Sequence, residues 1–151
     1  MFILSVDPGK ATGMALFSFE KGSEPEMLWS KELQFEEYAA PIREAYALAG
    51  SELHVVCERF TINAQTVRNS QAPFSLECIG VLKQIMLDNE VSVDTLKLQS
   101  PADAKAMFDN PKIKKLDYWH KGGEGHALDA IRHGLLYMVK LGWNPLNKLR
   151  G

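Results

Sequence analysis

The sequence has few cysteines and no biased tracts, and these absences exclude several classes of protein. Only Cys57 and Cys78 carry thiols among its 151 residues, far fewer than a small disulfide-stapled secreted domain would contain. We therefore expect two reduced, buried thiols and an intracellular, cytoplasmic protein. Low-complexity tracts are absent, and 46% hydrophobic with 24% charged residues is the composition of a globular chain rather than a disordered or fibrous one.

The sequence also lacks long apolar runs. Charge interrupts the longest apolar stretches within about ten residues, well short of the roughly 20 that a membrane-spanning helix needs, so we expect no membrane partner. Residues 1–7 carry no basic leader and no small-residue cleavage site, and we expect them to form a first strand rather than a signal peptide. A chain of 151 residues can bury about 68 to 70% of its unfolded surface, enough for one domain spanning residues 1–151.

The net charge is small, but its distribution is uneven. The whole chain carries −2 at neutral pH, whereas residues 97–151 hold ten basic and five acidic side chains. The first 96 residues are correspondingly acidic. A basic C-terminal third is compatible with a surface that faces phosphate groups, so nucleic acid is a candidate partner.

Hydrophobic periodicity and turn residues predict the order of strands and helices. Five strands are expected at residues 2–7, 14–19, 26–33, 53–58 and 93–98. Helices are expected at residues 36–49, 73–89, 100–108 and 124–142, and residues 109–123 are expected to form an irregular basic loop. Short turns make the first three strands antiparallel, and the unbroken apolar run of the fourth is typical of a parallel strand covered on both faces. The chain is therefore predicted to be an α/β domain with a mixed five-stranded sheet flanked by helices.

Three acidic residues stand where such a sheet would bring them together. Asp7 ends the first strand, Glu58 ends the fourth, and Asp129 lies one turn into the last helix. The carboxyl ends of parallel strands meet in the crevice where α/β proteins bind ligands, and close carboxylates need a compensating cation. Hard oxygen ligands suit Mg²⁺ or Mn²⁺, and two such ions about 4 Å apart can promote phosphodiester cleavage. His126, three residues before Asp129, faces the same side of the helix and supplies a fourth ligand.

Each of these residues also has an ordinary structural interpretation. Asp7 could simply start a hairpin turn, Glu58 could be a solvated strand end, and Asp129 could pair with the helix dipole. Taken together, three polar residues that end apolar elements favour the metal site. His133, one turn deeper in the same helix, is expected to be a hydrogen-bonded core group, and we exclude it from the predicted ligands.

Three short motifs carry a resemblance to a known family. They are Ser5-Val6-Asp7-Pro8-Gly9 with Thr12-Gly13, Cys57-Glu58-Arg59-Phe60, and Gly125-His126-Ala127-Leu128-Asp129-Ala130. In their order and spacing the chain resembles the RuvC-type Holliday junction resolvases of the RNase H-like superfamily, from residue 2 to about residue 140. The resemblance implies an RNase H-like fold and paired DNA nicks made across a four-way junction by a homodimer. The ligands that it implies for two metal ions are Asp7, Glu58, His126 and Asp129.

Further candidate residues concern DNA contact. The resemblance implies that Arg59, Phe60 and Arg68 meet the junction centre, where Phe60 could wedge against an unpaired base. A core position of the strand is the alternative for Phe60. Residues 112–121 interleave cations with aromatics, as phosphate contact and base stacking require, although a solvated basic loop would have the same composition. The cations predicted to contact phosphates are Lys10, Lys112, Lys114, Lys115 and Lys121.

Other functions compete with junction resolution. Residues 7–13 also resemble the phosphate hairpin of actin-like sugar kinases, but those enzymes enclose their nucleotide between two such domains, so no nucleotide cofactor is expected. A non-catalytic junction-binding protein would have no reason to keep carboxylates that repel each other. An RNase H-like nuclease that cuts forks, flaps or RNA–DNA hybrids is not separated from a resolvase by the sequence.

Overall fold

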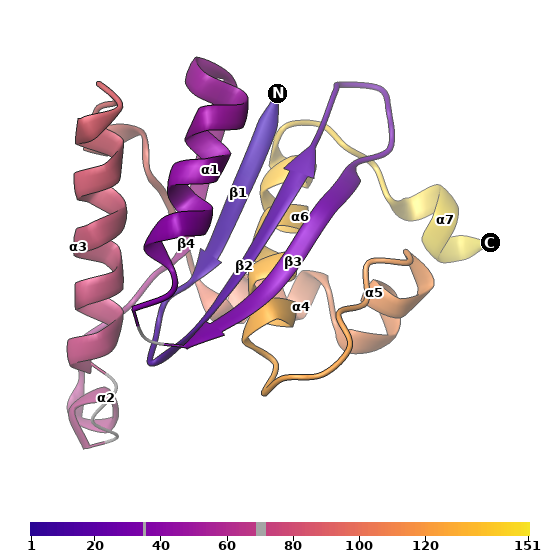
Figure 1. The fold of residues 1–151 in the computed structure, drawn as a ribbon. Coiled ribbons are helices and arrows are strands. Elements are labelled where there is room, and N and C mark those ends of the chain that lie inside the picture. The colour runs from indigo at the N-terminus through magenta and orange to yellow at the C-terminus, as the bar shows by residue number, and fades with distance from the viewer. Residues whose placement is uncertain (35, 69–71) are drawn as a thin grey trace.

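A computed structural model describes residues 1–34, 36–68 and 72–151, and its centre is a mixed five-stranded sheet (Figure 1). The strands are β1 Phe2–Asp7, β2 Ala11–Ser18, β3 Glu26–Gln34, β4 Leu53–Glu58 and β5 Lys97–Gln99. They lie in the order β3-β2-β1-β4-β5, with β1, β2 and β3 antiparallel and with β4 and β5 parallel to β1. This arrangement confirms the predicted fold class.

Helices cover both faces of the sheet. They are α1 Ala39–Ala49, α2 Ala64–Arg68, α3 Ala72–Asp88, α4 Pro101–Met107, α5 Asn110–Lys115, α6 His126–Lys140 and α7 Leu146–Arg150. The helices α1 and α3 pack on one face, whereas α4 and α6 pack on the other (Figure 1). Across the described ranges, the structure contains no helix with the length and apolar character needed to span a membrane.

Alternation along β1 and β4 decides which side chains reach which face. On β1, Val6 packs with α1 and α3, so its neighbour Asp7 turns toward α6. On β4, Cys57 packs with α1 and α3 in the same way, so Glu58 also turns toward α6. Val6 pairs with Cys57 in the parallel register. The next residues, Asp7 and Glu58, therefore lie side by side at the ends of the two strands. Cys57 and Cys78 are both buried free thiols, as predicted.

Four segments differ from the expected elements, and in two of them the short helices α2 and α7 were not predicted. Residues 93–98 form the 3₁₀ turn Val93–Thr95 and only a three-residue β5, so the strand predicted there was too long. The segment 109–123, predicted to be irregular, contains the six-residue helix α5. The carboxylate of Asp109 caps this helix by accepting the backbone N–H of Lys112 at 3.0 Å. A helix this short contains too few turns for hydrophobic periodicity to reveal it.

Gly13 lets the first turn of α6 touch the sheet. It pairs with Asp7 across β1 and β2, and a Cβ added to it would lie 1.9 Å from the carbonyl oxygen of His126. A backbone atom cannot move aside as the end of a flexible side chain can, so only glycine fits here. The close approach places the start of α6 directly against the end of β1.

Replacing Gly13 with alanine should lower the free energy of unfolding by about 3 kcal/mol, because α6 must move away from the sheet. Gly80 is the matched control, since it lies within α3 and an added Cβ would meet nothing within 4 Å. Gly80→Ala should raise the free energy of unfolding by about 0.5 to 1 kcal/mol. Urea unfolding followed by circular dichroism measures both changes, and a Gly13→Ala variant as stable as the wild type would contradict the close approach.

Candidate functional site

Asp7, Glu58 and Asp129 come together at the ends of β1 and β4 and in the first turn of α6. One carboxylate oxygen of each lies within 4.8 Å of the others. Asp7 is buried, and the other two are half-buried. The structure therefore brings together three of the four residues that the sequence nominates as metal ligands.

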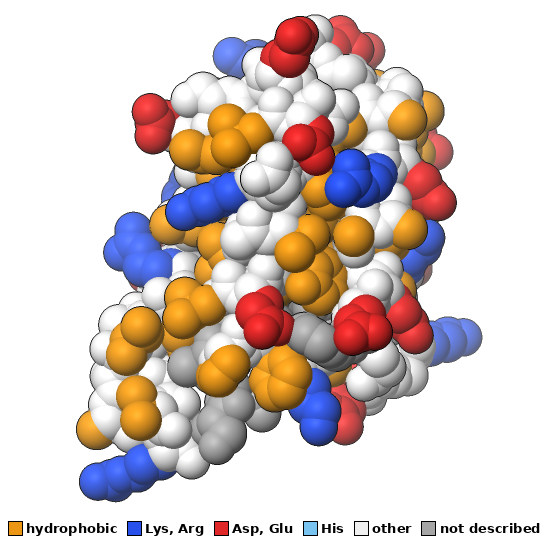
Figure 2. Space-filling model, turned by 60° about the vertical axis from the view of Figure 1, so that its left-hand side comes forward, with side chains coloured by type: hydrophobic (Ala, Val, Ile, Leu, Met, Phe, Trp, Pro, Cys, Tyr) orange, Lys and Arg blue, Asp and Glu red, His pale blue; other side chains and the backbone are white. Residues whose placement is uncertain are grey.

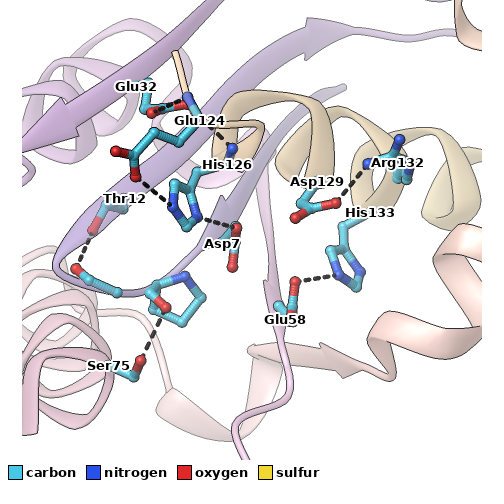
Figure 3. Close-up of polar contacts among 12 residues, drawn as sticks. Asp7, Thr12, Glu32, Glu58, Ser75, Glu124, His126, Asp129, Arg132 and His133 are labelled. Atoms are coloured by element: carbon cyan, nitrogen blue, oxygen red, sulfur yellow. Dashed lines mark hydrogen bonds and ion pairs between the residues drawn. The ribbon is translucent and has the colours of Figure 1, made fainter. Parts of the chain in front are cut away.

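This carboxylate cluster lies in a cavity of about 940 Å³. The walls come from the β1–β2 turn, the segment after β4, the starts of α4 and α6, and Ser75 of α3. Ser75 donates its hydroxyl to the carbonyl oxygen of Pro8 at 3.0 Å, which ties the β1–β2 turn to α3 (Figure 3). The cavity is large enough to admit part of a nucleic-acid strand or another extended polar ligand.

His126 is placed differently from the three carboxylates. Its Nδ1 lies 3.1 Å from Oδ2 of Asp7, and its Nε2 lies 3.8 Å from Oε2 of Glu124 (Figure 3). One ligand atom of His126 also forms a second group with one carboxylate oxygen each of Glu32 and Glu124, all within 4.8 Å of one another. The structure therefore gives a cluster of three carboxylates, with an imidazole hydrogen-bonded to Asp7 beside it.

Each of the three carboxylates has a partner on α6. His126 contacts Asp7, His133 Nε2 lies 3.2 Å from Oε2 of Glu58, and Arg132 donates to Oδ1 of Asp129 at 2.5 Å (Figure 3). The expectation that His133 is a hydrogen-bonded core group agrees with its 1% exposure and this contact. These partners hold the carboxylates in place and offset part of their negative charge.

Two further contacts fix Arg132. Its Nε donates to the carbonyl oxygen of Phe108 at 2.8 Å, and a terminal nitrogen donates to the amide oxygen of Asn110. The sequence analysis missed Arg132, although its i+3 spacing from Asp129 on a helix is a signal that could have identified it. The guanidinium thus ties the site to the segment that joins α4 and α5.

The pKa values of the site residues are shifted by burial and by the negative charges that lie close together. Burial raises the pKa of Asp7 to about 7, and the nearby charges of Glu58 and Asp129 act in the same direction. The hydrogen bond to Asp7 raises the pKa of His126 to about 9. Burial acts to raise the pKa of Glu58, but the hydrogen bond and charge of His133, a hydrogen bond to Asp7 and the charge of Lys105 together outweigh it and lower that pKa. Buried, mutually repelling oxygen ligands of this kind fit a hard divalent cation.

The predicted DNA-contacting residues fall into two groups. Lys10, Arg59 and Phe60 line the cavity that holds the carboxylates, and Arg68 is exposed at the end of α2. The other group consists of Lys112, Lys114 and Lys115 on α5 and the exposed Lys121, and like Arg68 these residues do not line the cavity.

Contacts within the chain engage the three lysines of α5. Lys112 donates to the carbonyl oxygen of Met107 at 3.2 Å, and Lys115 donates to that of Leu149 at 2.6 Å. The ammonium group of Lys114 lies 4.3 Å from the ring centre of Trp119. These contacts attach α5 to α4, to α7 and to its own following segment.

A second, smaller cavity of about 300 Å³ lies at the β5 edge of the sheet. Its lining includes three cations, Arg59, Lys97 and Lys140, and no acidic residue. Arg59 lines both cavities, so the two adjoin. The sequence analysis missed Lys97 and Lys140, because only the tertiary structure places β5 beside the end of α6.

Comparisons with known proteins identify the fold. No protein-family model matches the sequence, and no curated protein matches it. Thermus thermophilus RuvC in complex with a Holliday junction substrate superposes with a TM-score of 0.67 at 16% identity, over 94% of this chain and 97% of that chain. The fowlpox virus Holliday junction resolvase superposes with a TM-score of 0.54 at 17% identity, over 93% of this chain and 99% of that chain. These likenesses confirm the predicted RuvC-type, RNase H-like fold.

The stability of the metal-free protein should fall as the pH rises from about 6.5 to 9. Asp7 stabilises protonated His126, so this contribution is complete below the ordinary pKa of 6.5 and is lost as the pH rises through about 9. Asp7 also lowers the stability as the pH rises, but mainly at lower pH, because its pKa is raised from 3.8 to about 7 and its contribution is therefore lost mainly before this range begins. Thermal unfolding in EDTA should show a midpoint lower by about 3 °C or more at the upper end of this range.

The His126→Gln variant is the control for this pH dependence, since glutamine does not titrate. Burial raises the pKa of Cys78 to about 11, which lowers the stability of both proteins in strong base, so the difference between the two curves is the relevant quantity. That difference should shrink steadily between about pH 6.5 and 9. A constant difference would show that His126 is not paired with Asp7 in solution.

Proposed function

We propose that this chain, which shares its fold with RuvC and the fowlpox virus resolvase, is a structure-selective DNA endonuclease that resolves four-way junctions. The observation that carries the proposal is the cluster of Asp7, Glu58 and Asp129, whose oxygens lie within 4.8 Å of one another in a cavity of about 940 Å³. The RuvC structure that superposes on the chain is in complex with a Holliday junction substrate. We extend that substrate class to this protein.

The proposed mechanism is hydrolysis assisted by two Mg²⁺ or Mn²⁺ ions. Asp7, Glu58 and Asp129 would hold the ions, with His126 as a fourth ligand or as the partner that orients Asp7. When bound, the ions would lower the pKa of a water molecule and neutralise charge on the scissile phosphate. The chain itself keeps the carboxylates in register through His133 and Arg132, which contact Glu58 and Asp129.

DNA is proposed to enter the cavity over its basic rim. Lys10 and Arg59 line the cavity together with the acidic cluster, so they would contact phosphates on either side of the cut. Phe60 is the second residue after β4 and is half-buried in the cavity wall, where it would stack against an unpaired base. Arg68 and the lysines at 112, 114, 115 and 121 would meet the arms of the junction.

A homodimer is proposed because two opposed strands of a junction must be cut by two sites related by one axis. The face over α1 and α3, turned forward in Figure 2, carries exposed hydrophobic side chains among charged ones. Leu48, Leu76 and Leu87 are the large hydrophobic residues exposed on these two helices. This face supports self-association.

The free buried thiols support a reducing, intracellular compartment.

Asp7→Asn, Glu58→Gln and Asp129→Asn should each reduce metal-dependent cleavage of a four-way junction by at least about 10²-fold, because each removes a charged metal ligand. Junction binding and folding should be retained. The assay includes a fork, a flap, a duplex and an RNA–DNA hybrid in Mg²⁺ and in Mn²⁺. If the wild type prefers one of these other substrates, the proposal of junction resolution is wrong and cleavage of that substrate takes its place. A wild type that binds junctions but cuts nothing would indicate a non-catalytic binding protein.

The two basic surfaces can be tested separately through the salt dependence of junction binding. Lys97→Ala with Lys140→Ala should reduce the slope of log affinity against log salt by about 1.8, because each lost phosphate contact removes about 0.9. Lys114→Ala with Lys115→Ala is the matched pair. We expect a smaller change, because Trp119 and Leu149 engage both ammonium groups of this pair, whereas in the first pair, within the described residues, only Lys140 is engaged, by Gln99. An equal or larger change in the second pair would show that the α5 lysines, and not the cleft at the β5 edge, make most of the phosphate contacts of the junction arms.

The mass of the protein in solution should correspond to a dimer, with and without junction DNA. Leu76→Asp with Leu87→Asp should convert it to a monomer, because charge on this face opposes burial. Analytical ultracentrifugation measures both species. A wild type that stays monomeric on the junction would exclude paired nicking and favour a general structure-selective nuclease.

A further inference from the structure

Glu32 on β3 holds the chain that leads into α6. Its Oε1 accepts the backbone N–H of Glu124 at 2.7 Å, and its Oε2 accepts that of His126 at 3.1 Å (Figure 3). The residues are separated by 92 and 94 positions in the sequence. No motif links them, so only the folded chain brings this carboxylate to the start of the helix.

The start of α6 has no cap of its own. Its N-cap residue is Gly125, which has a φ of 98° and makes no side-chain capping bond. The first backbone N–H groups of a helix need acceptors from outside the helix, and a negative charge there also interacts favourably with the helix dipole. The carboxylate of Glu32 meets both needs from a neighbouring strand.

The loop before α6 is shaped around the same carboxylate. Gly123 has a φ of +72°, and a Cβ added to it would lie 2.5 Å from Oε2 of Glu32. Gly122 and Gly125 also have positive φ. A loop with three such glycines loses much conformational freedom on folding, so an anchor is needed to hold it in one conformation.

We infer that Glu32 is a positioning residue for the candidate metal centre: it caps α6 so that the ring of His126 reaches Asp7. The geometry forms a continuous chain of contacts, from Glu32 to the backbone N–H of His126 and from its Nδ1 to Oδ2 of Asp7 at 3.1 Å. Without the cap, the first turn of α6 would fray and His126 would leave Asp7. The inference rests on the proposed function only in treating Asp7 as a metal-holding residue.

The test compares the wild type with Glu32→Ala and Glu32→Gln, and Glu26→Ala serves as a control on the exposed start of the same strand. Mn²⁺ binding to the protein without DNA is measured by electron paramagnetic resonance. Amide exchange at residues 124–127 and the imidazole signal of His126 are followed by NMR without metal. Cleavage of a four-way junction gives kcat and KM.

Glu32→Ala should weaken Mn²⁺ binding about 10- to 100-fold and lower kcat by a similar factor, while KM for the junction changes less than about twofold. Exchange at residues 124–127 should rise. Glu32→Gln keeps one acceptor oxygen and should restore part of each loss, whereas Glu26→Ala should match the wild type. If Glu32→Ala does not fold, the glutamine variant carries the comparison.

A double-mutant cycle with His126→Ala separates positioning from a general structural role. Glu32→Ala should cost little further Mn²⁺ affinity once His126 is absent. Full additivity of the two losses, or wild-type exchange and Mn²⁺ affinity in Glu32→Ala, would overturn the inference. A wild type that binds Mn²⁺ but cuts no DNA would refute the proposed function and leave the binding and exchange comparisons decisive for Glu32.

Discussion

Three carboxylates that repel one another are held together in a mostly buried site, and the arrangement of α6 follows from this constraint. Asp7, Glu58 and Asp129 come from three different elements, yet one oxygen of each lies within 4.8 Å of the others. Without compensation such a cluster would oppose folding. The helix supplies one imidazole or guanidinium partner for each carboxylate, and each of these contacts engages one carboxylate oxygen.

The partners reach the carboxylates because α6 lies unusually close to the sheet. Gly13 removes the side chain that would strike the backbone of His126, and an added Cβ on Gly134 would lie 2.5 Å from the ring of Phe17. The helix α6 lies close to the sheet, and α4 packs against it as well. Its polar side is therefore buried too. Buried polar side chains require hydrogen-bonding partners, so the close packing and the polar network of the site depend on each other.

The positions of the charged side chains in the fold, and not their numbers in a segment, decide where acidic and basic surfaces form. The acidic cluster lines the cavity with buried or half-buried side chains, whereas Lys10 and Arg59, which also line it, are exposed. Three of the ten basic residues in 97–151 lie on α5, where contacts within the chain attach that helix to neighbouring elements. The adjoining cleft at the β5 edge is basic because Lys97 and Lys140 come from elements far apart in the sequence. The count of basic residues in a segment therefore does not locate the basic surface that lies beside the carboxylates.

The sequence by itself determined the sheet, the faces of its strands and the three carboxylates. Strand alternation has a period of two, so the apolar residues before Asp7 and Glu58 already specify the face toward which these side chains turn. Only the tertiary structure decided that His126 pairs with Asp7 beside the carboxylate cluster, that Glu32 caps α6, and that a basic cleft adjoins the cavity. Local patterns report the periodicity of one segment, whereas these contacts join segments as many as 119 positions apart. Such contacts depend on how closely helix and sheet pack. Small residues such as Gly13 permit close packing, but their presence in the sequence does not predict where it occurs.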